Sequence, residues 1–406
     1  MSGQATKSNP FRSLRHRNVR VYLFGLLLSN VGTWLQFTAT SLLIYRINNR
    51  ATDAGLNTMF QFLPMLLLGA WAGGFADRHD RRTVTIWTQS ALGLQAVLLA
   101  AADFGGFISL PVVYALSLVL GVANAIDNPS RRGLVTELVQ PEDIPNAMSL
   151  NTTVMTGSRI VGPALAAALI GPLGTAWLFA MNAVSYLAVL ASLLLLRRDE
   201  MVPSPPAPRT GKPVREALAF VWQDNHLRWS FLVFAVVSTF AFNYSVVLPK
   251  LADARWGSEN SFGWLLAVVS VGSLAGSLLT AGRETVSLRW FNASVFLLAI
   301  SNIALAWAPN LALAFVFSVP LGVGGAGFIA SVNSISQVMS PPDMRGRLLA
   351  FGAVAFLGST PVGGPVTGWI ADNVSPEWSL GYGGVIALLC CAWMASVVKR
   401  QPQSVA

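Results

Sequence analysis

Hydrophobic and polar residues are arranged along this chain in long blocks. Charge-free, largely apolar stretches long enough to span a membrane as helices recur from one end of the sequence to the other. A helix needs about 20 consecutive apolar residues to cross the hydrocarbon core of a bilayer. The pattern therefore predicts an all-α membrane protein whose spans are joined mostly by short polar loops.

The number of spans follows from the intervals between consecutive charged residues. Two long intervals can each cross twice, because a turn signal interrupts them at residues 171–174 and at Pro309-Asn310. Eight further intervals can each hold one span: Arg20 to Arg46, Asp53 to Asp77, Arg82 to Asp103, Asp103 to Asp127, Arg228 to Lys250, Glu259 to Arg283, Arg347 to Asp372 and Glu377 to Lys399. We therefore expect twelve transmembrane helices.

The chain divides into two similar halves. The segment 117–122 resembles 318–323, and Gly162-Pro163 resembles Gly364-Pro365, each pair being separated by about 200 residues. A shared offset indicates two six-helix pseudo-repeat bundles with a central cavity between them. The predicted organisation is a basic N-terminal segment over 1–20, a first bundle over 21–196, a proline-rich central loop over 197–228, a second bundle over 229–398 and a tail over 399–406.

The distribution of basic residues predicts the orientation, because Lys and Arg are retained on the cytoplasmic side. Of the 27 Lys and Arg residues, those outside the predicted inner segments are Arg46, Arg50, Lys250, Arg255 and Arg159. We expect both termini to be cytoplasmic. The net charge of +9 then reflects topology, and no nucleic-acid partner is needed to explain it.

Composition excludes most other classes of protein. The chain is 53% hydrophobic and only 11% charged, whereas soluble domains have roughly 25% charged residues. The two cysteines, Cys390 and Cys391, are adjacent, so they offer neither a disulfide framework nor the usual spacing of metal ligands. No catalytic triad or phosphate-binding loop is present. We expect no enzymatic activity, no cofactor and no metal site.

A loop motif between spans two and three gives the first family resemblance. The residues 73–82, Gly-Gly-Phe-Ala-Asp-Arg-His-Asp-Arg-Arg, resemble the signature loop of the major facilitator superfamily, with Asp80 in place of its usual glycine. Together with twelve spans and a central loop, this resemblance covers essentially the whole chain. It implies a secondary transporter that works by alternating access.

The resemblance also implies a gating role for the motif. Asp77 would lie against the positive N-terminal end of span eleven, and Arg81 would pair with an acidic residue of span four, which the family pattern identifies as Asp127 at the inner end of that helix. The alternative is that these are ordinary interfacial charges. The predicted gating residues are Gly73, Asp77, Arg78, Arg81, Arg82 and Asp127.

Further segments resemble one bacterial branch of the superfamily, which holds drug-efflux proteins and the enterobactin exporter. They are residues 127–132, 159–165 and 345–347. The branch implies a functional monomer in the bacterial inner membrane. Span five also resembles the small-residue motif of antiporters, although close helix packing explains small residues equally well. The residues of that motif are Ser158, Arg159, Gly162 and Pro163.

Polar and aromatic residues at helical spacing indicate a substrate cavity, which spans one, four, seven and ten line in this superfamily. Arg159 lies near mid-membrane, where an unpaired cation is costly, so it faces either a cavity or structural partners. The other candidates are Asn30, Trp34, Phe37 and Ser41 on span one, Asn124 and Asn128 on span four, Thr239 and Asn243 on span seven, and Asn333 and Gln337 on span ten. Such a lining suits a bulky amphipathic small molecule.

The proton carrier is the least defined part of the prediction. No Asp or Glu is expected at mid-span, so Asp127 is the nearest candidate. The resemblance favours proton-coupled efflux of a drug-like compound or secreted metabolite. An importer on the same fold and a non-transporting membrane receptor remain the alternatives.

Overall fold

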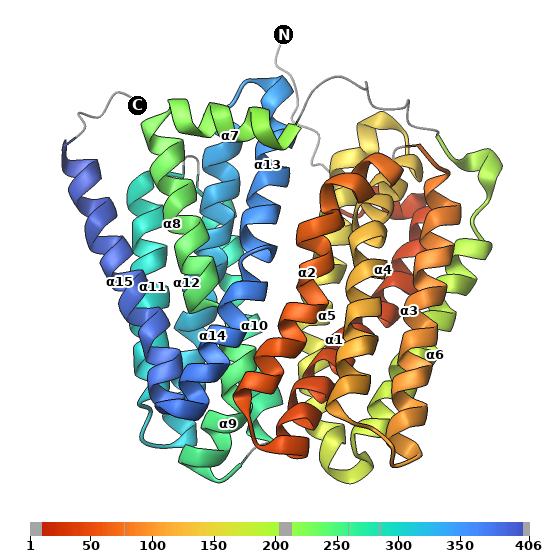
Figure 1. The fold of residues 1–406 in the computed structure, drawn as a ribbon. Helices are drawn as coiled ribbons and strands as arrows, with labels where there is room; N and C mark the ends of the chain where they lie inside the picture. Colours follow the sequence, from red (N-terminus) through yellow and green to blue (C-terminus); the bar gives the residue numbers. More distant parts are fainter. Residues whose placement is uncertain (1–9, 77, 203–212, 259, 284–285, 401–406) are drawn as a thin grey trace.

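The computed structural model describes residues 10–76, 78–202, 213–258, 260–283 and 286–400. In this part of the chain the secondary structure is helical throughout, and the helices stand side by side in two groups (Figure 1). The first group consists of α1 (Arg17–Asn48), α2 (Ala51–Ala76), α3 (Arg81–Phe104), α4 (Leu110–Glu137), α5 (Ile144–Leu173) and α6 (Thr175–Leu194).

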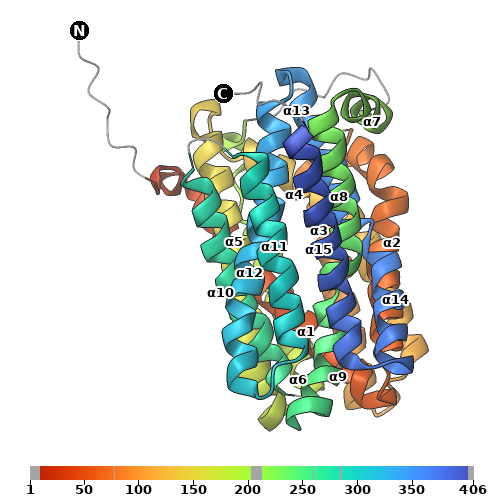
Figure 2. The ribbon, with the colours of Figure 1, turned by 90° about the vertical axis from the view of Figure 1, so that its left-hand side faces the viewer.

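The second group follows the central loop. It consists of α8 (Asn225–Ala241), α9 (Tyr244–Trp256), α10 (Ser261–Ala281), α11 (Leu288–Ala306), α12 (Leu311–Val338), α13 (Pro342–Leu357), α14 (Thr360–Asn373) and α15 (Pro376–Arg400). Helix α7 (Pro213–Gln223) lies across one end of this group (Figure 1). We call that end of the molecule the α7 end and the opposite one the α9 end. The first residues of α1 and the last residues of α15 both lie at the α7 end (Figure 2).

Ten helical segments in the described part of the chain are long and apolar enough to cross a membrane. Helices α1 and α2 are long but are not among the ten. In α1 a series of polar residues, including Asn30, Thr33 and Gln36, lowers the hydropathy. The all-helical membrane fold is confirmed, whereas the twelve spans and the cytoplasmic termini stay predictions.

Two predicted spans of the second half are broken in the structure. Span seven is divided between α8 and α9, where the side-chain amide of Asn243 donates to the carbonyl of Thr239 at 2.6 Å and occupies an acceptor of the last helical turn. Span eleven is divided between α13 and α14 at Gly358-Ser359, just before Pro361, which has no backbone N–H to continue the helix. The described parts of the central loop contain helix, in α7 and in a short 3-10 turn (Arg198–Glu200), whereas the predicted proline-rich linker lies outside the described residues.

Equivalent glycines in the two halves make equivalent close contacts. A Cβ atom on Gly121 of α4 would lie 2.4 Å from the carbonyl oxygen of Gln61 in α2. One on Gly322 of α12 would lie 2.0 Å from the carbonyl oxygen of Val269 in α10. Small residues allow helix backbones to approach closely in a membrane protein. The contacts fit the predicted duplication, because Gly121 and Gly322 occupy matching positions in the two repeated segments.

The N-terminal segment packs on the first half through a single acidic residue. A 3-10 turn (Arg12–Arg15) precedes α1. Asp143, at the start of α5, forms an ion pair with Arg15 at 2.7 Å and a hydrogen bond with the His16 ring at 2.8 Å. The backbone N–H of Ser13 also donates to the Asn146 side chain at 2.9 Å. The predicted basic segment is thus folded against α5, and α1 begins a few residues before the predicted boundary.

The halves meet mainly at the α9 end. Helix α2 contacts α14 there, and the Tyr45 hydroxyl of α1 donates to Asp253 of α9 at 2.7 Å. Toward the α7 end α2 and α13 diverge (Figure 1). On that part of α2, Cβ atoms placed on Gly69, Gly73 and Gly74 would meet no atom of the described chain within 4 Å. The contacts between the halves therefore concentrate at the α9 end, and α2 and α13 lie farther apart toward the α7 end (Figure 1).

Candidate functional site

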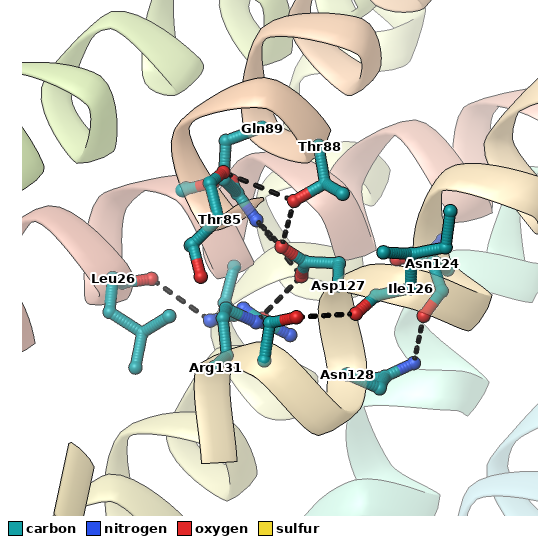
Figure 3. A network of polar contacts seen from close by, with 12 residues as sticks. Leu26, Thr85, Thr88, Gln89, Asn124, Ile126, Asp127, Asn128 and Arg131 are labelled. Carbon is teal, nitrogen blue, oxygen red and sulfur yellow. Dashed lines mark hydrogen bonds and ion pairs between the residues drawn. The ribbon is translucent and has the colours of Figure 1, made fainter. Parts of the chain in front are cut away.

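A buried carboxylate on α4 forms the centre of the most polar region of the first half. Asp127 is completely buried, and its oxygens accept hydrogen bonds from the Thr88 hydroxyl at 2.7 Å and from the Gln89 amide at 3.0 Å (Figure 3). The Arg131 guanidinium lies 2.7 Å from the same carboxylate. Asp127 therefore contacts a cation and two neutral hydrogen-bond donors directly.

Helix geometry explains this arrangement. Arg131 follows Asp127 by four residues, so both side chains lie on one face of α4, and that face turns toward α3, which supplies Thr88 and Gln89. A buried charge is stable only when it is paired and hydrogen-bonded, and here both conditions are met. The pair is electrically neutral as a unit, which makes its burial in a membrane protein possible.

The position of Asp127 along α4 corrects one sequence expectation. The residue lies ten positions before the end of α4 at Glu137, which corresponds to about 15 Å along the helix axis. It is therefore inside the helix bundle and not at the inner end of the span.

Unpaired polar atoms surround the carboxylate. The Tyr22 hydroxyl and Gln89 Oε1 are buried without a hydrogen-bond partner in the described part of the chain. Tyr22 and Tyr186 both lie within electrostatic range of Asp127 and Arg131. A site with a spare acceptor and a spare hydroxyl can accommodate either protonation state of the carboxylate, because a protonated Asp needs an acceptor that an ionised one does not.

The loop motif is only partly described. Asp77, the predicted latch residue, lies outside the described residues. Arg81 pairs with Glu137 at the end of α4, at 3.0 Å, so the predicted pairing of Arg81 with Asp127 is wrong in this structure. Arg82 is buried and donates to the carbonyl oxygens of Leu193 and Leu194 at the end of α6.

Two further motif residues have no side-chain partner among the described residues. Gly73 lies on the unpacked part of α2, and Arg78 is exposed, with its backbone N–H donating to the Phe75 carbonyl at 3.1 Å. The gating function predicted for the motif stays a prediction. What the structure adds is that Arg81 and Arg82 join α3 to α4 and α6 inside one half.

The antiporter-like motif lies where α5 meets α1 and α10. Ser158 is buried and donates to the Val154 carbonyl of its own helix. A Cβ on Gly162 would lie 2.4 Å from Trp34 Cβ on α1. The carbonyl of Pro163 lies near Gly263 of α10, in the second half. The small residues thus serve close helix packing, and one of these contacts joins the two halves.

Arg159 is exposed on α5, and its guanidinium carbon lies 4.9 Å from the centroid of the Trp34 ring. Trp34 in turn forms an edge-to-face pair with Phe37, at 5.3 Å between centroids. The structure therefore places a cation over an aromatic pair of α1.

The remaining cavity candidates form no common cluster. Asn30, Ser41, Thr239 and Asn243 donate to carbonyls of their own helices, and the Asn128 amide donates to the Asn124 carbonyl at 2.9 Å. On α12, Asn333 is half-buried and Gln337 is exposed. Their role as cavity lining stays a prediction.

Sequence reasoning missed the partners of both acidic residues on α4. Arg131 could have been found from its four-residue spacing to Asp127, which places the two on one helical face. Thr88, Gln89 and Glu137 gave no comparable signal, because their proximity depends on how α3 packs against α4. In the described part of the chain no group of three or more His, Cys, Asp or Glu residues is close enough to hold a metal ion.

Comparison with known proteins adds a family match and several relatives. The chain matches the transmembrane secretion effector family over residues 8–405. The multidrug efflux pump Tap of Mycolicibacterium fortuitum is 26% identical, over 86% of this chain and 88% of Tap. The enterobactin exporter EntS of Salmonella typhi is 22% identical, over 96% of this chain and 95% of EntS.

Solved structures of transporters share the fold. A bacterial homologue of the human lysosomal transporter Spinster, in an inward-facing and unoccupied conformation, superposes with a TM-score of 0.73 at 15% identity, covering 96% of this chain and 99% of that one. A POT family transporter in complex with a thioalcohol-conjugated peptide gives a TM-score of 0.77 at 11% identity, covering 95% and 96%. These likenesses concern the fold alone.

Proposed function

Because this chain belongs to the transmembrane secretion effector family of major facilitator transporters, we propose that it is a proton-coupled exporter of amphipathic organic molecules. It is a membrane transporter and not an enzyme. Export is favoured by relatives named as exporters, among them Tap and EntS. The proposed location is the bacterial inner membrane, with the α7 end cytoplasmic and a single chain as the functional unit.

The observation that carries proton coupling is the environment of Asp127. A fully buried carboxylate within a span is rare and is a functional candidate by default. Its pairing with Arg131 stabilises the ionised form, whereas Tyr22 and Gln89 offer the extra hydroxyl and acceptor that a protonated form requires. A change in the distance between Asp127 and Arg131 would then shift the proton affinity between the two states of the cycle.

The substrate site that we propose lies between the halves, around Arg159. Trp34 and Phe37 supply an aromatic surface from α1, and the packing of α5 against α10 places this region beside the second half. Aromatic side chains bind apolar bodies, and a neighbouring guanidinium attracts an acidic or electron-rich group. This composition favours amphipathic molecules over small inorganic ions.

The test compares the Asp127→Asn variant with the wild type in everted membrane vesicles. Substrate-dependent proton release and gradient-driven transport should be lost, because Asn has nearly the same shape but cannot carry the proton. Exchange of labelled for unlabelled substrate, which needs no net proton movement, should persist. The matched control is Asp103→Asn, which removes a carboxylate of the same half that accepts from Thr175 at 2.5 Å, and it should leave both activities unchanged.

Two outcomes would contradict the proposal. Gradient-driven transport that survives in Asp127→Asn would exclude this residue as the proton carrier. A panel of dyes, antibiotics and acidic metabolites that accumulates more in cells producing the wild-type protein would show import in place of export.

A further inference from the structure

The α9 end of the molecule contains a carboxylate of one half that caps a helix of the other. Asp372 lies near the end of α14, in the second half. Its oxygens accept from the backbone N–H of Ala51 at 2.9 Å, from the backbone N–H of Thr52 at 2.8 Å and from the Thr52 hydroxyl at 2.5 Å. Ala51 and Thr52 are the first residues of α2, in the first half.

The chemistry of a helix N-terminus explains why this contact is favourable. The first N–H groups of a helix have no partner within the helix, and the aligned peptide dipoles give that end a partial positive charge. Residues before the helix usually provide the capping oxygen. Here Asp372 provides it from the opposite half, and its side chain is only 8% exposed, so the interaction is shielded from solvent.

A cation of the same half keeps the carboxylate neutralised. The Lys250 ammonium of α9 lies 2.5 Å from Asp372, and both residues belong to the second half. The pair would therefore remain together if α2 moved away. Because Asp372 would not be left as an unpaired buried charge, the cap can be broken and reformed without the large penalty of an isolated ion.

The backbones also approach closely beside the cap. A Cβ on Gly368 of α14 would lie 2.4 Å from the Ala51 carbonyl oxygen, and one on Gly55 of α2 would lie 2.4 Å from the Gly364 carbonyl oxygen. The opposite end of α2 has no such contact at Gly69 or Gly73. Helix α2 is therefore held to the second half at its N-terminal end.

We propose that Asp372 is an interhalf latch that stabilises the conformation closed at the α9 end. In an alternating-access transporter this contact breaks once in each cycle, so its strength sets the balance between the two conformations. Asp372 is thus a positioning residue for transport and need not touch substrate. The inference rests on the transporter fold and not on the direction of transport or on proton coupling.

The test measures both ends of the molecule in one variant, Asp372→Asn. Spin labels at Phe107 and Pro309, which lie in loops at the α9 end of different halves, report opening there. Labels at Glu142 and Gln223 report closure at the α7 end. The purified full chain, with its two native cysteines replaced by alanine, is measured by pulsed electron spin resonance in lipid nanodiscs.

Asn cannot form the ion pair with Lys250 and is a weaker acceptor for the α2 N–H groups. We expect the ratio of α9-open to α9-closed molecules to rise about tenfold, with the reciprocal change at the α7 end. The matched control is Glu377→Gln. Glu377 also pairs with a cation of α9, Arg255, at 3.3 Å, but both of these residues belong to the second half, so the control should not change the ratio.

Unchanged populations in folded Asp372→Asn, or an equal shift in the Glu377→Gln control, would overturn the latch. If Asp372→Asn does not fold, Thr52→Val decides the question, because it removes only the hydroxyl donor. That variant should shift the ratio in the same direction by about two- to fivefold. No shift in Thr52→Val would then overturn the proposal.

Discussion

The two halves of the molecule share an architecture but have different interiors. The first half contains the Asp127–Arg131 ion pair and a chain of amides in which Gln36 donates to Gln95 at 3.0 Å and Asn182 donates to Gln36 at 2.8 Å. The second half is filled with phenylalanine. Its ring contacts join Phe234, Phe242, Phe291 and Phe356 directly or through Phe328, with centroids 5.0 to 5.9 Å apart.

This difference distinguishes features that both halves share, and that the fold requires, from features of one half that can serve function. Equivalent glycines, Gly121 and Gly322, make the same close helix contacts in both halves, so packing at these positions does not depend on a polar interior. Buried polar groups in a membrane are costly unless all are satisfied, whereas aromatic packing carries no such requirement. The buried Asp127–Arg131 pair is therefore best explained by chemistry carried out in the first half, with the second half as a more rigid partner.

The largest effect should come from breaking the buried ion pair from one side. Arg131→Gln leaves Asp127 as an uncompensated buried charge, and we expect a loss of about 3–5 kcal/mol of unfolding free energy. The double variant Asp127→Asn/Arg131→Gln should recover most of that loss, because no charge remains buried. The measurement is reversible unfolding in mixed micelles.

A more exposed pair of the same half provides the control for this experiment. Arg81 and Glu137 are paired at 3.0 Å with side chains 15% and 13% exposed, whereas Asp127 is fully buried, so Arg81→Gln should cost less unfolding free energy than Arg131→Gln. If Arg131→Gln and the double variant Asp127→Asn/Arg131→Gln lost the same unfolding free energy, the pair would contribute only packing. The contrast between the two interiors would then have no functional meaning.

A substitution in the aromatic interior should have a smaller and purely structural effect. Phe328 is fully buried and contacts Phe234 and Phe291. Phe328→Leu should lower the unfolding free energy by about 1–2 kcal/mol through lost ring contacts and a small cavity. The number of protons moved per substrate should stay the same. A change in that ratio would place part of the coupling chemistry in the second half.

Much of the fold could be predicted from the sequence, because the length of an apolar run is a local property. Helix interruptions were harder, since a broken span and a continuous one have the same composition. The break between α8 and α9 depends on the Asn243 side chain replacing a backbone donor, and the break before α14 has only Gly358 and Pro361 as local signals. Helix α7 was not predicted, because the proline-rich segment that precedes it favoured an unstructured central loop.

Of the candidate site, Asp127 was named from the sequence, but the residues that pair with it were not. The family motif predicted that Arg81 and Asp127 pair with each other, but each has a different partner in the structure. Arg131 already occupies the Asp127 carboxylate from the next helical turn, and Glu137 lies about 15 Å further along α4. Which acid an arginine of α3 reaches is decided by the packing of two helices, and no local pattern records that.

The smallest effect, and the most selective, should come from the guanidinium between the halves. Arg159→Gln removes the cation above Trp34, and we expect the Michaelis constant for acidic amphipathic substrates to rise about tenfold, while neutral substrates of similar shape are unaffected. Transport into everted vesicles, measured for one acidic and one neutral dye, provides both values. The second half offers a matched control outside the proposed site. Arg283 follows the end of α10, and its guanidinium carbon lies 3.5 Å from the centroid of the Trp290 ring in α11.

Arg283→Gln loses the same kind of contact and should change neither Michaelis constant. Equal weakening for both dyes in Arg159→Gln would instead identify Arg159 as a structural residue that joins α5 to α1, and the recognition of substrate would have to be sought among the aromatic rings alone.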